Sequence, residues 1–170
     1  MKKVVVILLM FLSIFMISGC GKEKEKKDVL ADDEVILEGI KYKLDQDTSE
    51  YGIDFKIANN FRRVDNGNAI SYHSEKIDGA SYFVFRIFHY KKKSIDYAIK
   101  DTTIEYDKKY ETKIGDLDYT VVHFVNPIGE GIETNIYYYK HGKDVYAFCF
   151  TSSIDLSRLE DIFLKSIVYK

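Results

Sequence analysis

The chain has 170 residues, and its 25 basic and 27 acidic side chains give a formal charge of −2 at pH 7. Nucleic-acid-binding proteins need a basic face, so this balance argues against nucleic acid as a partner. The 14 Tyr and 11 Phe, with no Trp, are typical of a strand-rich core.

The N-terminal residues follow the pattern of a secretory signal. Lys2 and Lys3 precede an apolar run from Val4 to Phe15, and the small residues Ser18 and Gly19 follow it. The run is shorter than the roughly 20 apolar residues that a membrane-spanning helix needs. We therefore expect export rather than a membrane span.

The stretch Ile17-Ser18-Gly19-Cys20 resembles the lipobox of bacterial lipoproteins. The resemblance implies a signal peptide over residues 1–19, cleavage between Gly19 and Cys20, and diacylglyceryl transfer to the Cys20 thiol. Two acyl chains anchor a protein stably, at about 0.8 kcal/mol per buried CH₂. The resemblance therefore implies a lipid-anchored protein on the extracytoplasmic face of a cell membrane. An ordinary signal peptide with a chance cysteine, or an uncleaved anchor helix, is the alternative.

Lipidation of Cys20 would leave Cys149 without a disulfide partner. The exported domain must then be stabilised by its apolar core. Residues 20–34 are mostly charged, with no aromatic residue, which predicts a disordered tether. Glutamates alternate with its lysines, so a polybasic lipid-binding patch is not favoured. Residues 35–170 fit a single globular domain.

Residues 35–90 alternate between strand patterns and turn signals. The predicted strands are Val35–Leu37, Ile40–Leu44, Tyr51–Ala58, Ala69–His73 and Ser81–Tyr90. The predicted turns are Glu38-Gly39, Asp45–Glu50, Asp65–Asn68 and Asp78-Gly79. The spaced acids of the second turn suggest a calcium loop, but Glu50 stands where that loop needs Gly and Lys56 where it needs Glu.

The sequence of the second half of the domain predicts two helices with further strands between them. Ser94 is a suitable N-cap for a helix to about Lys109, with Tyr106 on its inner face. Asp155 can cap a final helix whose apolar stripe ends at Ile167. Between them we expect a strand ending near Ile114, the strand Asp118–Val125, a loop over Asn126–Glu133, and a hairpin of Thr134–Lys140 with Asp144–Thr151.

Short connections predict a mainly antiparallel central sheet, and two amphipathic helices predict that both of its faces carry helices. The order of the predicted helices and strands in this α+β domain resembles the PsbP-like fold, an α/β/α sandwich found in photosystem extrinsic proteins and bacterial lipoproteins. The resemblance lies in the order of these segments: Tyr51–Phe61, Tyr82–Tyr90, the helix from Ser94, Ile114–Tyr119, Tyr146–Phe150 and the helix Asp155–Ile167. The family often has Pro and Trp in its opening turn, where Asn59-Asn60-Phe61 stand here. The resemblance implies a mostly noncatalytic family and no active site.

The residues that could carry chemistry form no recognisable catalytic or metal-binding motif. The four histidines, which have no partner at metal-ligand spacing, are His73, His89, His123 and His141. We expect Cys149 to be a small core thiol, since it lies between Phe148 and Phe150. Tyr137-Tyr138-Tyr139 fit either core positions or a partner-binding patch. We therefore predict no catalytic residue, metal or cofactor.

Two loops are the candidate interaction surface, because loops carry function. Their residues are Asn66, Gly67, Pro127, Gly129 and Gly131. The first hypothesis is a noncatalytic protein- or ligand-binding module with a partner in the cell envelope. The alternatives are an enzyme or metal-binding protein with a nonlocal His/Asp site, and a small-ligand sensor or immunity-type lipoprotein.

Overall fold

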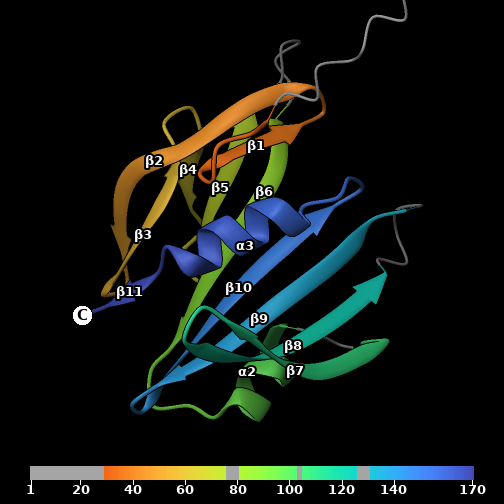
Figure 1. Ribbon diagram of the computed structural model, residues 1–170. Coiled ribbons are helices and arrows are strands. Elements are labelled where there is room, and N and C mark those ends of the chain that lie inside the picture. Colours follow the sequence, from red (N-terminus) through yellow and green to blue (C-terminus); the bar gives the residue numbers. More distant parts are fainter. Residues whose placement is uncertain (1–28, 76–80, 103–104, 126–130) are drawn as a thin grey trace, which may run out of the picture.

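The computed structural model describes residues 29–75, 81–102, 105–125 and 131–170, which form two β-sheets and two short helices (Figure 1). The small sheet has the order β1-β2-β3-β11, and the large sheet the order β4-β5-β6-β10-β9-β8-β7. The small sheet comprises β1 (Glu34–Leu37), β2 (Ile40–Glu50), β3 (Ile53–Ala58) and β11 (Val168–Tyr169). The large sheet comprises β4 (Arg62–Asp65), β5 (Ile70–Glu75), β6 (Ser81–Tyr90), β7 (Lys108–Ile114), β8 (Leu117–Val125), β9 (Glu133–His141) and β10 (Asp144–Ser152). The helices are α2 (Ile95–Thr102) and α3 (Ser157–Lys165).

Neighbouring strands in both sheets pair antiparallel. Tight turns join several of them, and two of the predicted turns are confirmed. Glu38 and Gly39, both at positive φ, close the hairpin in which Leu37 pairs with Ile40. A two-residue turn of this kind matches the right-handed twist of the strands it joins. The predicted turn at Asp65–Asn68 is also confirmed, and a further hairpin closes at Gly115-Asp116.

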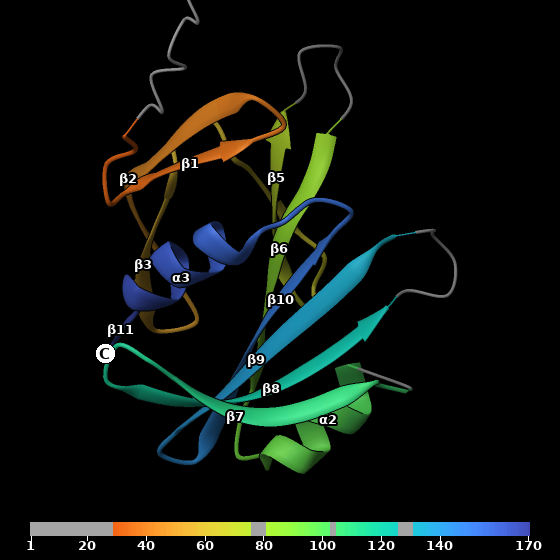
Figure 2. The same cartoon turned by 45° about the vertical axis from the view of Figure 1, so that its right-hand side comes forward.

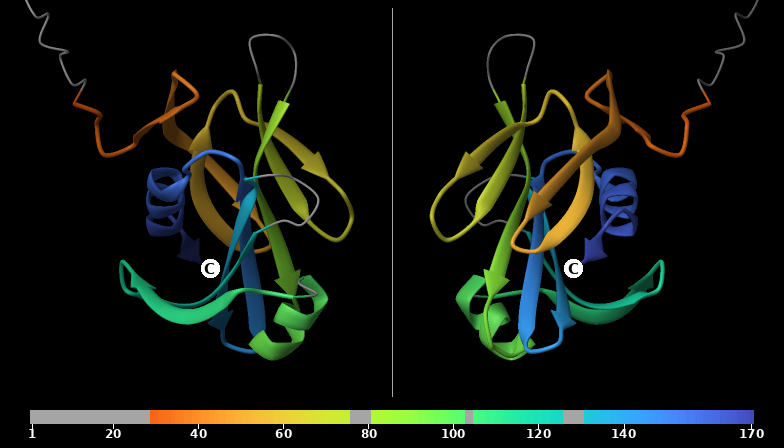
Figure 3. Two further views of the ribbon diagram at one scale, coloured as in Figure 1. Left: turned by 90° about the vertical axis from the view of Figure 1, so that its right-hand side faces the viewer. Right: turned by 90° about the vertical axis from the view of Figure 1, so that its left-hand side faces the viewer.

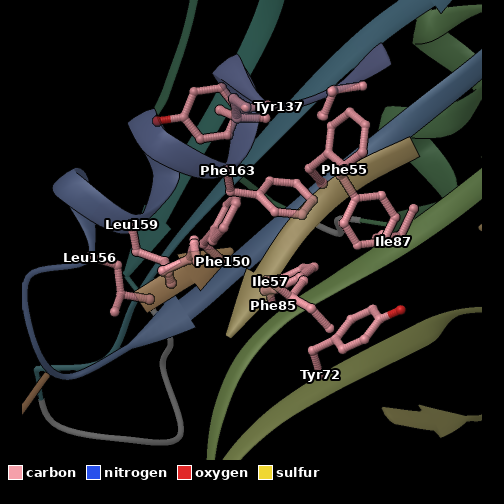
Figure 4. Close-up of a cluster of buried hydrophobic side chains, with 14 of the residues drawn as sticks. Phe55, Ile57, Tyr72, Phe85, Ile87, Tyr137, Phe150, Leu156, Leu159 and Phe163 are labelled. Atoms are coloured by element: carbon pink, nitrogen blue, oxygen red, sulfur yellow. The ribbon is translucent and has the colours of Figure 1, made fainter. Parts of the chain in front are cut away.

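Two apolar cores lie on the two faces of the large sheet. The larger core fills the space between the large sheet, the small sheet and α3, and includes Phe55, Tyr72, Phe85 and Phe163 (Figure 4). The smaller core lies between α2 and strands β8 to β10, and includes Ala98, Ile136 and Cys149 among its buried residues. Strands β8 to β10 are apolar on both faces because both faces are covered.

Helix α3 contacts the small and the large sheet through one aromatic ring. The ring centroid of Phe163 lies 5.2 Å from that of Phe55 on β3 and 4.4 Å from that of Phe85 on β6 (Figure 4). It also lies 5.7 Å from Phe148 and 5.8 Å from Phe150 on β10. Tilted and edge-on aromatic contacts at these separations add to the free energy gained from burial.

The predicted α/β/α sandwich with helices on both faces is wrong. The small sheet covers much of one face of the large sheet, with α3 beside it (Figure 2). The eight-residue α2 covers only part of the other face. The physical reason is that the N-terminal residues 34–58 pair with one another and with β11 as a separate sheet, which occupies the place that a helix layer would need.

Three individual elements also differ from the prediction. Residues 45–50 continue β2 instead of forming a turn, because they pair with β3 across a register shift between Leu44 and Gln46. The helix from Ser94 ends at Thr102 rather than near Lys109, and a strand begins at Lys108. Tyr106 is therefore 46% exposed rather than on an inner helix face. The strand β11 was not predicted, and its pairing with β3 depends on where α3 ends.

Helix α2 begins at its predicted cap, Ser94, whereas α3 begins one residue later than predicted, with Leu156 at its N-cap position and Asp155 in the turn before it. The Ser94 hydroxyl accepts a hydrogen bond of 3.1 Å from the Tyr97 amide, and Asp155 accepts one of 2.9 Å from the Ser157 amide. Within the described ranges, no helix is long and apolar enough to cross a membrane. The predicted signal peptide, Cys20 and the turn at Asp78-Gly79 lie outside the described residues.

Replacing Phe163 should destabilise the domain more than a substitution at the surface does. Phe163 is fully buried and contacts four rings, so Phe163→Ala should lower the free energy of unfolding by about 3–5 kcal/mol. The control Tyr106→Ala removes a half-exposed ring and should change it by less than about 1 kcal/mol. Urea denaturation followed by circular dichroism measures both values. Equal losses in the two variants would contradict the role given to Phe163.

A candidate binding face around helix α3

Three hollows in the described surface are each lined in part by α3. The tether groove, about 510 Å³, lies between α3 and the first described residues, and its lining includes Asp32, Asp33, Lys56, Arg158 and Asp161. The turn groove, about 370 Å³, lies between the end of α3 and the β7–β8 turn, and its lining includes Ile114, Leu117, Leu164, Ile167 and Tyr169. The polar cavity, about 80 Å³, lies at the start of α3, and its lining includes Glu133, Asn135, Asp155, Ser157 and Glu160.

Arg158 holds the start of the domain against α3. Its Nε donates a hydrogen bond of 2.7 Å to the Glu34 carbonyl, and its Nη2 donates one of 2.7 Å to the Ala31 carbonyl. A planar guanidinium suits such a pair of acceptors, and a lysine could not reproduce both bonds. The last residues of the predicted tether, 31–34, are therefore attached to the domain, with Ala31 and Glu34 also bonded to each other.

Glu160 is the most deeply buried carboxyl in the described residues, with only 6% of its surface exposed. Its Oε2 accepts a hydrogen bond of 2.6 Å from the Tyr137 hydroxyl, and its Oε1 accepts one of 3.1 Å from Asn135 Nδ2. Asn135 Oδ1 in turn lies 3.0 Å from His123 Nδ1. The network joins α3 to β9 and β8 beneath the polar cavity.

Burial raises the pKa of Glu160, and the hydrogen bonds from Tyr137 and Asn135 oppose the shift. Burial, reinforced by the neighbouring Glu160, also raises the pKa of Tyr137. Perturbed carboxyls often mark functional sites, but structural networks perturb them too. Within the described residues, no group of three or more His, Cys, Asp or Glu side chains is arranged to hold a metal ion.

The turn groove is more apolar than the tether groove. Its lining residue Val168 is 60% exposed. Tyr169, another lining residue, has a buried hydroxyl without a hydrogen-bond partner among the described atoms, as does the fully buried Tyr119. Burial and the neighbouring Tyr119 raise the pKa of Tyr169. The groove therefore presents aliphatic surface beside a buried phenol.

The four histidines lie apart in four different strands or strand ends. His89 lies 3.0 Å from Asp144 and stacks on Tyr146, while His141 stacks on Tyr169. His73 lies on β5, where burial lowers its pKa, and His123 belongs to the Asn135 network. The structure brings no three of them together.

Cys149 and the tyrosine run prove to be core residues. Cys149 is buried, and burial raises the pKa of its thiol, as expected for an inert core cysteine. Tyr137 and Tyr138 are buried on opposite faces of β9, and Tyr139 is partly buried.

The predicted interaction residues do not lie on α3. The turn with Asn66 and Gly67 joins β4 to β5, on the side of the molecule away from α3 (Figure 3). The Asn66 side chain donates to the Ser71 hydroxyl at 3.1 Å, and the Gly67 amide donates to Asp65 at 2.8 Å, so these groups stabilise the turn itself. Gly131 is exposed just before β9, while Pro127 and Gly129 lie outside the described residues.

Sequence reasoning missed Arg158 and Glu160. A signal for Glu160 was present, because it stands four residues after Leu156 and three before Phe163, on the apolar stripe of the predicted helix. A charged residue on such a stripe needs a partner. Arg158 gave no comparable signal, since a surface arginine on a helix is ordinary.

Comparisons with known proteins bear on the fold alone. No family model matches the chain, and no curated protein matches it. A crystal structure of a protein from Bacteroides thetaiotaomicron is similar, with a TM-score of 0.51 and 14% sequence identity. The similarity covers 70% of this chain and 45% of that one, so this chain spans less than half of its neighbour's length.

Replacing Arg158 by lysine should loosen the first described residues. The charge is kept but the fork of two hydrogen bonds is lost, so the amides of Glu34 and Leu44, which bond to Ala31 and Asp33, should exchange hydrogen about tenfold faster. Hydrogen exchange measured by NMR tests this. The control Arg63→Lys, which alters a fork to Glu50, should leave both amides unchanged. Unchanged rates in Arg158→Lys would refute the clamp.

Glu160→Gln should change how stability depends on pH. Since the folded state raises the pKa of Glu160, it binds this proton more tightly than the unfolded state does, and stability falls as pH rises above the ordinary carboxyl range. The Gln variant should therefore be more stable than wild type at pH 8 and lose that advantage at pH 4. Urea unfolding across this range measures the difference. A difference between Glu160→Gln and wild type that stays constant across this pH range would contradict the assignment.

Proposed function

We propose that this chain is a lipid-anchored, noncatalytic binding module on the extracytoplasmic face of a cell membrane, and that its protein partner binds the face around α3. The anchoring part rests on the lipobox-like residues Ile17 to Cys20 and the signal pattern before them. The binding part rests on the observation that three hollows share one helix.

The character of these hollows favours a protein surface over an enclosed small-molecule site. The two grooves together combine aliphatic residues such as Ile162 and Leu117 with charged residues such as Lys165 and Asp116. Protein interfaces have this mixture of an apolar centre and a polar rim. Among the described residues, the Phe163 side of α3 is packed with aromatic side chains.

Catalysis finds less support in the described residues. The histidines are separated, Cys149 is an inert core thiol, and the Glu160 carboxyl is hydrogen-bonded by Tyr137 and Asn135. A nucleophile, a base and oxyanion donors within reach of one another are the minimum for a recognisable enzyme site. The described side chains offer no such set.

The anchoring part predicts that Cys20→Ala releases the protein from the membrane. The variant lacks the thiol that would carry the acyl chains, so the chains that would hold the protein in the membrane are lost. After cell fractionation, wild type should be in the membrane fraction and should partition into the detergent phase of Triton X-114. The Cys20→Ala protein should instead leave the membrane fraction and remain in the aqueous phase.

A matched control is Cys149→Ala, which removes the other cysteine and should leave the distribution as in wild type. If Cys20→Ala and wild type fractionate identically, the anchoring proposal fails. Affinity capture from solubilised membranes then tests the binding part, with full-length wild type compared with a variant carrying Asp161→Ala and Lys165→Ala on α3. Recovery of the same protein at equal yield by both baits would contradict binding at α3.

A further inference from the structure

The large sheet ends at an open edge strand. β7 is the last strand in the sheet order, and among the described residues its outer edge pairs with no other strand (Figure 2). It has seven residues, whereas the other edge strands, β1, β4 and β11, have four, four and two. β1 is also partly covered, because its Glu34 carbonyl accepts a hydrogen bond from Arg158. The longest open edge of the described structure is therefore β7, and such an edge is a template for another strand.

The pairing of β7 with β8 shows which of its backbone groups point outward. A two-residue turn joins Ile114 to Leu117, so these two residues form a hydrogen-bonded pair, as does every second pair along the hairpin. The register runs without a shift along the whole of β7. The amides and carbonyls of Lys109, Glu111 and Lys113 therefore point away from β8. A strand added at this edge would bond to those three residues.

The side chains along this edge are exposed or half-buried. Tyr110 is 45% exposed and lies on the same face as Ile114, which packs against the larger core. Lys108 and Lys113 are exposed, and so is Asp116 in the turn that follows. Within the described part of the chain, none of these three charged groups has an opposite charge at ion-pair distance. Open backbone groups, an exposed ring and charges without partners thus lie along one line.

In one register, β7 is complementary to a second copy of itself. The register is antiparallel and centred on Thr112, with a twofold axis between the two copies of this residue. Residues of matching character then stand opposite one another, twice each: Glu111 and Lys113, Lys108 and Asp116, Tyr110 and Ile114. Opposite charges and pairs of an aromatic with a β-branched residue stabilise a sheet when they face each other across two strands. Lysines usually protect an edge strand from pairing, but in this register no lysine faces another lysine.

The neighbouring registers fit less well. Centring the pair on Glu111 places this carboxylate opposite itself and Lys109 opposite Lys113, and like charges directly opposite each other destabilise a sheet. Centring it on Tyr110 places Lys113 opposite Asp107, whose carboxylate already accepts a hydrogen bond of 3.0 Å from a backbone amide of β8. Of the three registers, the first gives an opposite charge to every charge on this edge that lacks one.

We propose that two copies of this chain associate through β7, in the antiparallel register centred on Thr112, so that the large sheet continues from one copy into the other. The open edge selects a polypeptide strand, because a backbone ladder pairs its outward amides and carbonyls in order. The pattern of side chains selects this chain's own strand. Tyr110 of the second copy then lies beside Ile114, which lines the turn groove. The dimer goes beyond the proposed function and adds an aromatic residue to one of its three hollows.

The twofold symmetry makes the register testable with single cysteines. Residue 112 would lie opposite its own copy in a non-hydrogen-bonded pair, with the two Cα atoms about 4.5 Å apart, which is within disulfide range. The background is the full-length Cys20→Ala chain, purified in a non-ionic detergent, in which the buried Cys149 is the only other thiol. Under mild oxidation, Thr112→Cys should form covalent dimers at least about tenfold faster than Tyr110→Cys or Glu111→Cys, because only residue 112 faces itself. Non-reducing gels measure the rates.

A charge exchange on the same background tests the side-chain pairs. Lys113→Glu places like charges opposite each other twice, so the dissociation constant of the dimer should rise roughly tenfold. Glu111→Lys/Lys113→Glu restores opposite charges and should return the constant to within about threefold of its original value. The control Lys143→Glu makes the same change of charge at an exposed position in the β9–β10 turn and should have no effect. Analytical ultracentrifugation measures the constants, and urea unfolding checks that each variant is folded.

Four outcomes would overturn the proposal. The chain could stay monomeric at every concentration up to its solubility limit. Tyr110→Cys or Glu111→Cys could crosslink as fast as Thr112→Cys, which would exclude the register. Lys143→Glu could weaken the dimer as much as Lys113→Glu does, or the exchanged variant could fail to recover. The measurements use a chain without Cys20 and alter no residue of α3, so their failure is distinct from failure of the anchoring or of the binding at α3.

Discussion

The packing of α3 between the two sheets is the contact on which the rest of the described structure depends. Phe163 touches rings from both sheets, Arg158 bonds to the carbonyls of residues 31 and 34, and the Lys56 amide donates to Ser166 just after the helix. The chain then continues from α3 directly into β11, which pairs with β3. The C-terminal helix thus fixes the N-terminal sheet in place, and both grooves exist because α3 lies between the sheets without filling the space beside it.

Local sequence patterns predicted most strands and turns but not how they assemble. The hairpin at Glu38-Gly39 and the cap at Ser94 follow from short-range chemistry, and both are confirmed, whereas Leu156 stands at the N-cap of α3 in place of the predicted Asp155. Residues 45–50 are polar with no apolar alternation, so only their pairing with β3 makes them a strand. The separate small sheet, and hence the error of an α/β/α sandwich, depends on such long-range pairing, which periodicity does not encode.

The candidate functional residues also differ in whether local sequence patterns could predict them. Glu160 could have been recognised from its place on an apolar helical stripe, whereas Arg158 required knowledge of which backbone carbonyls lie opposite α3. The residues Asn66 and Gly67 correctly predicted a turn. The Asn66 side chain and the Gly67 amide form hydrogen bonds within that turn and its flanking strands.

In the proposed function, a protein partner binds around α3 while the chain is anchored in the envelope. Site-specific photo-crosslinking in living cells tests it most directly, with p-benzoylphenylalanine at the exposed position 161 on α3 and, as a control, at the exposed position 68 in the β4–β5 turn. The account predicts one defined crosslinked protein from position 161, in the membrane fraction, and none from position 68. Crosslinks to the same protein from both positions, or from position 68 alone, would contradict it.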